Sequence, residues 1–225
     1  GGPSFGGRAH PPPPPFEGGR RKYTDFPEVW KTNRHSDGAA NALLRTKNAY
    51  QAVLDNYGYN GTTYPEKEWI ITEINLPRKP FPDPSDPGQQ FIGSAEAQRN
   101  FIIKAMVTCM ANDIQQMQVY KLAEDTKFEN AYSEFDLMGL YQRLDYNHGY
   151  YQQLNDLGIA HKTASDVLFG KTYDPTRTAQ LQLPANVGGT ALKDVFGNFT
   201  YVLWAKTQTD QSESASATYS FPTGL

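Results

Sequence analysis

The sequence has almost no cysteine and no long apolar run. Its one cysteine, Cys109, cannot form a disulfide within the chain, which excludes a disulfide scaffold and a cysteine-rich zinc site. No stretch approaches the roughly 18 to 20 consecutive apolar residues that a membrane-spanning helix requires, so we expect no membrane span. A basic and then apolar N-terminal pattern is missing too, and the chain starts with Gly1-Gly2. We therefore expect a piece of a longer precursor whose targeting signal lies outside it.

The chain also lacks a large excess of positive or negative charge. The formal net charge is −3, from 21 Lys and Arg against 24 Asp and Glu, and the two signs are interspersed. A basic stripe that could bind a phosphate backbone is absent, so we expect no nucleic-acid partner. The histidines and the acidic residues show no spacing typical of zinc or calcium sites. We predict no metal and no cofactor.

Aromatic residues and prolines are what the chain has in abundance. Aromatics make up 13% of the residues, with 14 tyrosines, and rigid rings that also donate hydrogen bonds suit a carbohydrate partner. Residues 1–35 are rich in Gly, Pro and Arg and contain five consecutive prolines at 11–15. This composition predicts an extended arm or a long loop, which serves either as a surface linker or as an arm around a neighbouring subunit.

The middle of the chain reads as alternating helices and strands. Apolar residues at spacings of three and four predict helices over residues 37–57 and 94–112, with a shorter helix at 161–169. Residues 69–73 form a short, continuous apolar strand that ends in Glu73, as expected for a strand buried on both faces of a parallel sheet. A second strand is predicted at 114–120, after a proline-rich loop over 77–87. This order is typical of parallel βα units.

After Pro175 the apolar period changes to two. Alternation around residues 181–183, 199–203 and 215–221, with turns predicted at Gly188-Gly189 and Gly197-Asn198, indicates a small antiparallel β unit. We accordingly divide the chain into an arm (1–35), an α/β part (36–175) and a β segment (176–225).

Four short runs carry a resemblance to a known family: WIITEIN at 69–75, YKLAED at 120–125, MGLY at 138–141 and YVLWA at 201–205. In this order they resemble the last third of retaining glycoside hydrolases with a (β/α)8 barrel, the clan with xylosidase-, iduronidase- and cellulase-like members. The resemblance covers residues 36–221. It implies an α/β fold consisting of a partial TIM barrel, its last two to three βα units, followed by a β-sandwich segment. The rest of the same polypeptide or another chain would then complete the barrel.

The same resemblance implies a catalytic site. Glu73 matches the nucleophile that ends the seventh strand of the family's barrel. The acid/base of the family belongs to an Asn-Glu pair on the fourth strand, and this chain contains no such pair. Retaining chemistry needs both carboxyl groups, so the acid/base must lie outside this chain. We expect Asn75, Gln118 and Tyr120 to contact the substrate, and His35 either to contact it or to have a capping or structural role.

Three interpretations remain open from the sequence. The first is a portion of a secreted or cell-surface glycoside hydrolase-like protein that acts on polysaccharide. The second is a non-catalytic glycan-binding or structural surface protein that keeps the barrel scaffold, because a fold can outlast its activity. The third is a freestanding domain of another α/β type.

Overall fold

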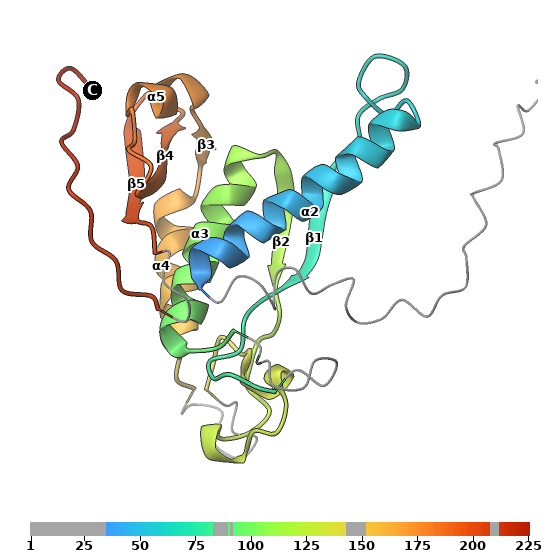
Figure 1. The fold of residues 1–225 in the computed structure, drawn as a ribbon, viewed down its shortest axis with the longest axis vertical. Helices are drawn as coiled ribbons and strands as arrows, with labels where there is room; N and C mark the ends of the chain where they lie inside the picture. The colour runs from blue at the N-terminus through green and yellow to red at the C-terminus, as the bar shows by residue number, and fades with distance from the viewer. Residues whose placement is uncertain (1–34, 83–89, 91, 143–151, 208–211) are drawn as a thin grey trace, which may run out of the picture.

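The computed structural model describes residues 35–82, 90, 92–142, 152–207 and 212–225. The fold is mixed α/β, with one parallel and one antiparallel sheet (Figure 1). The predicted arm lies outside the described residues except for His35. The helices are α2 (Ser36–Asn56), α3 (Ala95–Ala111), α4 (Asp156–Leu168) and α5 (Pro175–Gln180), with 3₁₀ turns η2 (Phe128–Asn130) and η3 (Glu134–Leu137). The strands are β1 (Trp69–Ile74), β2 (Ile114–Val119), β3 (Lys171–Tyr173), β4 (Val187–Asp194) and β5 (Phe199–Ala205).

The predicted strand–helix–strand unit is confirmed. β1 and β2 pair in parallel and α3 connects them, as the sequence pattern indicated. Local capping explains where the helix begins, because the Ser94 hydroxyl accepts a hydrogen bond from the Ala97 N–H at 2.9 Å. A closed barrel is not formed by the described residues, whose parallel sheet has two strands.

Helices cover one face of the parallel sheet. Ile71 and Ile74 of β1 pack against Leu43 of α2 and Cys109 of α3. On the opposite face Ile70 is 48% exposed, and Gln116 of β2 is exposed as well. The prediction that this strand is buried on both faces is therefore wrong for the described residues, because no described element covers that second face.

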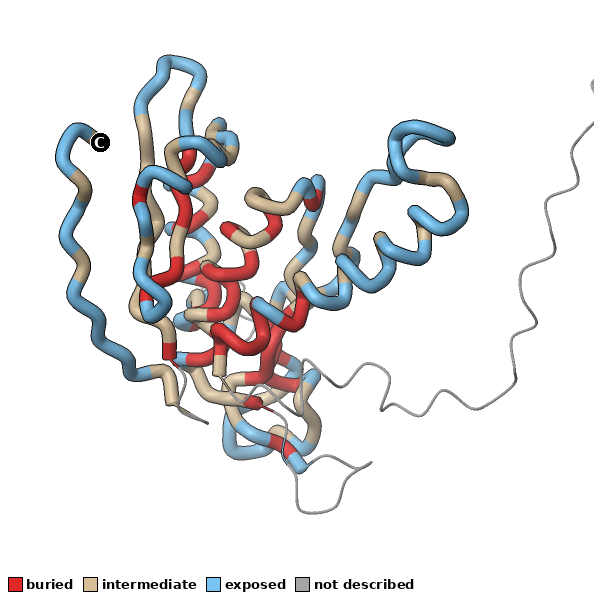
Figure 2. The backbone as a smooth tube through the Cα atoms, turned by 45° about the horizontal axis from the view of Figure 1, so that its top comes forward, coloured by how far each residue is buried: buried red, intermediate tan, exposed pale blue. Residues whose placement is uncertain are grey.

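Only the first third of α2 is buried. Figure 2 shows the remainder of this helix projecting from the body of the molecule as an exposed rod. Tyr50 and Val53 lie on this part with 55% and 52% of their surface exposed, and Tyr57 at the C-cap is 53% exposed. Within the described residues, no helix combines the length and the apolarity needed to cross a membrane.

The second sheet is antiparallel and has the order β3–β4–β5. It packs on α3 and α4 through a core that includes Leu168 and Leu192, and Figure 1 shows it apart from the parallel pair. An antiparallel sheet in this part of the chain was thus predicted correctly, and β5 covers the strand expected at 199–203. Helix α4 begins five residues earlier than its predicted start at His161, because the Asn155 side chain caps the Gly158 N–H at 2.9 Å.

Three details of the predicted β segment are wrong. Residues 181–183 form no strand but follow the short helix α5, which begins at Pro175 because the Asp174 side chain caps the Arg177 N–H at 2.7 Å and proline suits the first helical turn. Gly188 lies inside β4, where an added Cβ would meet the Trp204 ring at 2.5 Å, so glycine is there for close packing and not for a turn. Residues 215–221 form no strand.

The C-terminal segment is held by side chains instead of by strand pairing. The Tyr219 hydroxyl donates to the Leu181 carbonyl at 2.6 Å, and the rings of Phe221 and Tyr201 meet edge-on at 4.8 Å. In Figure 1 the segment runs as an extended trace at one side of the molecule. A second sheet of a sandwich is not formed by the part of the chain that the structure describes.

Candidate functional site

Glu73 is brought to the surface by an irregularity of β1. Ile71 pairs with Met117 and Ile74 with Val119, so β1 has one more residue than β2 over the same interval. Ile71 and Ile74 consequently both face the helices, while Glu73 between them is exposed. An extra residue of this kind re-aims side chains and is common beside functional sites. The Glu73 carboxylate thus stands at the carboxyl end of a parallel strand.

Gln118 and Tyr120 lie at the matching end of β2. Met117 and Val119 pack among helix residues, so alternation places Gln118 on the open face of the sheet, where it is exposed. The N–H of Tyr120 donates to the Ile74 carbonyl at 3.1 Å, which fixes Tyr120 beside the end of β1. The structure therefore gathers Gln118, Tyr120 and Glu73 at one end of the sheet.

Asn75 has a different position from the one the sequence indicated. It is 6% exposed. Its amide nitrogen donates to the carbonyls of Tyr120 and Met138, the latter at 2.5 Å, while its oxygen accepts from the Leu76 N–H at 2.8 Å. With these bonds made, the side chain ties the segments after β1 and β2 together. Asn75 therefore has a structural role, because its hydrogen bonds fix the positions of the two strand ends.

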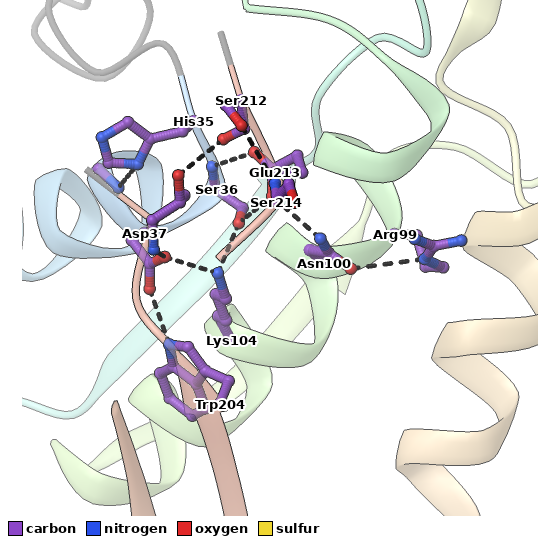
Figure 3. Close-up of polar contacts among 12 residues, drawn as sticks. His35, Ser36, Asp37, Arg99, Asn100, Lys104, Trp204, Ser212, Glu213 and Ser214 are labelled. Atoms are coloured by element: carbon purple, nitrogen blue, oxygen red, sulfur yellow. Dashed lines mark hydrogen bonds and ion pairs between the residues drawn. The ribbon is translucent and has the colours of Figure 1, made fainter. Parts of the chain in front are cut away.

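His35 is the N-cap of α2. Its Nδ1 accepts a hydrogen bond from the Gly38 N–H at 3.1 Å. Among the hydrogen bonds of the described residues, none joins His35 to Glu73. Figure 3 shows His35 next to a polar cluster at the start of α2. The structure gives His35 a capping role.

The cluster in Figure 3 joins four parts of the chain. Asp37 of α2 pairs with Lys104 of α3 at 2.8 Å, and both side chains are 8% exposed. The second Asp37 oxygen accepts from the Trp204 indole N–H of β5 at 2.7 Å. Ser36 donates from its N–H and its hydroxyl to Glu213 of the C-terminal segment, at 2.7 and 2.6 Å. These bonds fix the antiparallel sheet and the C-terminal segment against the helices.

Sequence reasoning missed a buried ion pair between the segments that follow β1 and β2. Glu124, whose side chain is 0% exposed, accepts two hydrogen bonds from the Arg78 guanidinium, one of them at 2.7 Å. The Asn155 amide approaches the same carboxylate at 3.4 Å. A carboxylate so enclosed has no room for a leaving group or a water molecule. Glu124 lies in the YKLAED run, but no spacing marks its Arg78 partner 46 residues away.

Burial alters the pKa of two groups that lie in the core or at its edge. It raises the pKa of the Cys109 thiol to about 12, so this cysteine is a core residue and no nucleophile. It lowers the pKa of His161 on α4. On the surface, hydrogen bonds from Asn198 lower the pKa of Asp194 in the β4–β5 turn. None of the three groups contributes to the end of the parallel sheet where Glu73 lies.

The chemistry that this end of the sheet offers is that of one accessible carboxylate with amide and aromatic neighbours. Such a carboxylate can act as a nucleophile or accept hydrogen bonds from hydroxyl groups. Within the described residues, no group of histidine, cysteine or acidic side chains is arranged to hold a metal ion. No protein-family model, curated protein or solved structure matches this chain.

Proposed function

We propose that the chain is part of a glycoside hydrolase-like protein that acts on polysaccharide by a retaining mechanism. One observation carries the proposal. Glu73 is exposed at the carboxyl end of a parallel strand, because the irregularity of β1 turns its side chain away from the helices. In βα barrels this end of the strands carries the reacting groups.

Glu73 would act as the nucleophile. Its carboxylate attacks the anomeric carbon while an acid protonates the leaving oxygen, and water then cleaves the glycosyl ester with the same acid acting as base. Gln118 and Tyr120 would contact sugar hydroxyls, and Asn75 would hold the ends of the two strands in place. His35 stays a prediction as a substrate contact. Glu124 is enclosed by Arg78, so the acid/base would come from outside this chain.

Two exposed features support a larger assembly around this unit. No described element covers the face of the parallel sheet that exposes Ile70, and Tyr50 and Val53 of α2 are exposed together with Tyr57 at its C-cap. Apolar side chains aligned on a helix and an uncovered sheet face normally pack against further structure. We propose that the rest of the polypeptide or another chain supplies it and completes the barrel. With a polysaccharide as substrate, the protein would act outside the cell or on the cell surface.

A second function is favoured by the lack of a candidate acid/base in this chain. The chain has no Asn-Glu pair, and Glu124 is buried in an ion pair. A protein that kept Glu73 as a hydrogen-bond acceptor but lacked an acid/base would bind glycans without cleaving them. This alternative predicts binding with no covalent intermediate.

Covalent labelling separates the two functions. The protein that contains this chain would be treated with cyclitol epoxide and aziridine probes of gluco, xylo and manno configuration, which trap the nucleophile of retaining glycosidases. Peptide mass spectrometry should then find the label on Glu73. The label should vanish in Glu73→Gln and persist in Glu68→Gln, an exposed glutamate just before β1.

Each other result has a definite meaning. Hydrolysis with a label on a different carboxylate would show that Glu73 is not the nucleophile. Polysaccharide binding without hydrolysis and without label would favour the glycan-binding alternative. If the protein shows no labelling, no hydrolysis and no binding, both functions are rejected.

A further inference from the structure

Three aromatic side chains stand exposed on the loop that follows β2. Phe128 and Phe135 are each 44% exposed and Tyr132 is 88% exposed. Phe128 and Phe135 belong to the 3₁₀ turns η2 and η3, and Tyr132 lies between these turns. A single exposed aromatic needs no explanation, but three on one short loop indicate a surface that binds something.

Contacts from Lys79, Arg78 and Asp136 hold the loop in place. The Lys79 ammonium donates to the carbonyls of Phe128 at 3.2 Å and Ala131 at 3.0 Å. The Arg78 guanidinium lies 4.8 Å from the centre of the Phe128 ring. One Asp136 oxygen accepts from the Tyr132 N–H at 3.0 Å. Rings on a loop held in this way lose little conformational freedom when a ligand binds.

The loop also adjoins the Glu73 site. The Phe135 ring lies 6.1 Å from the Tyr120 ring in an edge-on arrangement, and Tyr120 directly follows β2. The Lys121 N–H donates to the Met138 carbonyl at 2.9 Å, which folds the loop back against the strand end. In Figure 1 the segments that follow β1 and β2 gather at the same end of the molecule. A long ligand bound at Glu73 would continue onto this loop.

The residues around the rings favour a sugar chain over a protein partner. Polar or charged residues separate the three rings along the loop: Glu129, Asn130, Ser133 and Glu134. The buried centre of a protein interface is instead apolar and continuous. A pyranose ring has an apolar C–H face for an aromatic ring and a rim of hydroxyls for polar neighbours.

We infer that Phe128, Tyr132 and Phe135 form a polysaccharide-binding surface, which holds a chain of pyranose units beyond the sugar bound at Glu73. The inference rests on the proposed function for its ligand class. The three rings stack on successive or neighbouring sugars, and Phe135 connects this surface to Tyr120. Affinity for a long glycan then exceeds affinity for a monosaccharide.

The test measures glycan binding without turnover. In the protein that contains this chain, Glu73→Gln would serve as the parent, and binding to soluble arabinoxylan, glucomannan and mixed-linkage β-glucan would be measured by affinity electrophoresis and calorimetry. Tyr132→Ala should weaken binding about three- to tenfold, and Phe128→Ala/Tyr132→Ala by more than tenfold. Phe196→Ala is the matched control, because Phe196 is 86% exposed on the β4–β5 turn and should leave binding unchanged.

The outcomes distinguish this surface from the proposed function. Unchanged polysaccharide binding in the double variant would overturn the surface, as would failure of the parent to bind any of the three polysaccharides. Small cyclitol probes reach only the Glu73 site, so labelling of Glu73 should be the same with and without Tyr132→Ala in the otherwise unaltered protein. Loss of labelling at Glu73 with retained, ring-dependent binding would reject the catalytic proposal and keep the surface. Tyr132 has an exposed side chain, so its variant decides the matter if Phe128→Ala does not fold.

Discussion

Lys104→Met should destabilise the protein strongly, because it opens the buried cluster at the start of α2. The Lys104 ammonium donates to the Ser36 hydroxyl at 2.7 Å and to Asp37 at 2.8 Å, and its side chain is 8% exposed. Removing one partner of a buried pair costs about 3 to 5 kcal/mol, since the other charge stays buried. Asp37 keeps the Trp204 indole and the Thr207 N–H as donors, at 2.7 and 2.9 Å. We therefore expect the lower value, about 3 kcal/mol.

The chain offers a matched control for this effect. Lys162 and Asp166 form a pair of similar length on α4, 2.6 Å, but their side chains are 68% and 66% exposed. An exposed pair of this kind contributes about 0.3 to 0.5 kcal/mol, because water screens the charges. Lys162→Met removes the same positive charge and adds the same side chain, so burial is the main difference between the two variants.

Urea unfolding followed by tryptophan fluorescence and circular dichroism would measure both variants. With a denaturant dependence of about 2 kcal/mol per M, Lys104→Met should lower the midpoint by about 1.5 M and Lys162→Met by less than about 0.3 M. Equal shifts for the two variants would refute the reasoning, because the Lys104–Asp37 pair would then be screened like a surface pair. A large shift for Lys162→Met alone would refute it as well.

Three further predictions concern single positions. Burial raises the pKa of Cys109 to about 12, so a disulfide reagent at about pH 8 should modify it only in denaturant; rapid modification of the native protein would contradict this. Burial lowers the pKa of His161, so the unfolded chain binds more protons and the free energy of unfolding should fall as the pH drops below about 6.5. His161→Gln should flatten that pH dependence in urea unfolding, and an unchanged slope would disprove it. A Cβ at Gly139 would lie 2.1 Å from the Glu124 nitrogen, so Gly139→Ala should lower the free energy of unfolding by about 2 to 3 kcal/mol. Gly61→Ala, in open space at φ +77°, should lower it by about 1 kcal/mol, and equal losses would argue against the clash.

The parallel unit could be predicted from the sequence because its signals are local. The spacing of apolar residues and the Ser94 cap define α3, and the short apolar run defines β1. Each of these signals depends on neighbours within a few residues. The parallel pairing of β1 with β2 followed, because a helix between two strands crosses over from one end of the sheet to the other.

Local signals were also misread where two of them compete. The period of two suggested a strand at 181–183, but the Asp174 cap and Pro175 begin a short helix just before it, and residues 181–183 form no strand. Gly188-Gly189 suggested a turn, but Gly188 packs under the Trp204 ring inside β4. In the second case the deciding contact comes from another strand, so the sequence around the glycines could not reveal it.

The sequence by itself determined that Glu73 lies near the end of a strand that is followed by polar and aromatic residues. Only the tertiary structure decided how that end is built: the extra residue in β1, the burial of Asn75 and the enclosure of Glu124 by Arg78. The physical reason is the same in each case. Strand register and buried hydrogen bonds join residues far apart in the chain, such as Asn75 and Met138, and no local pattern records which distant partner a polar side chain will find.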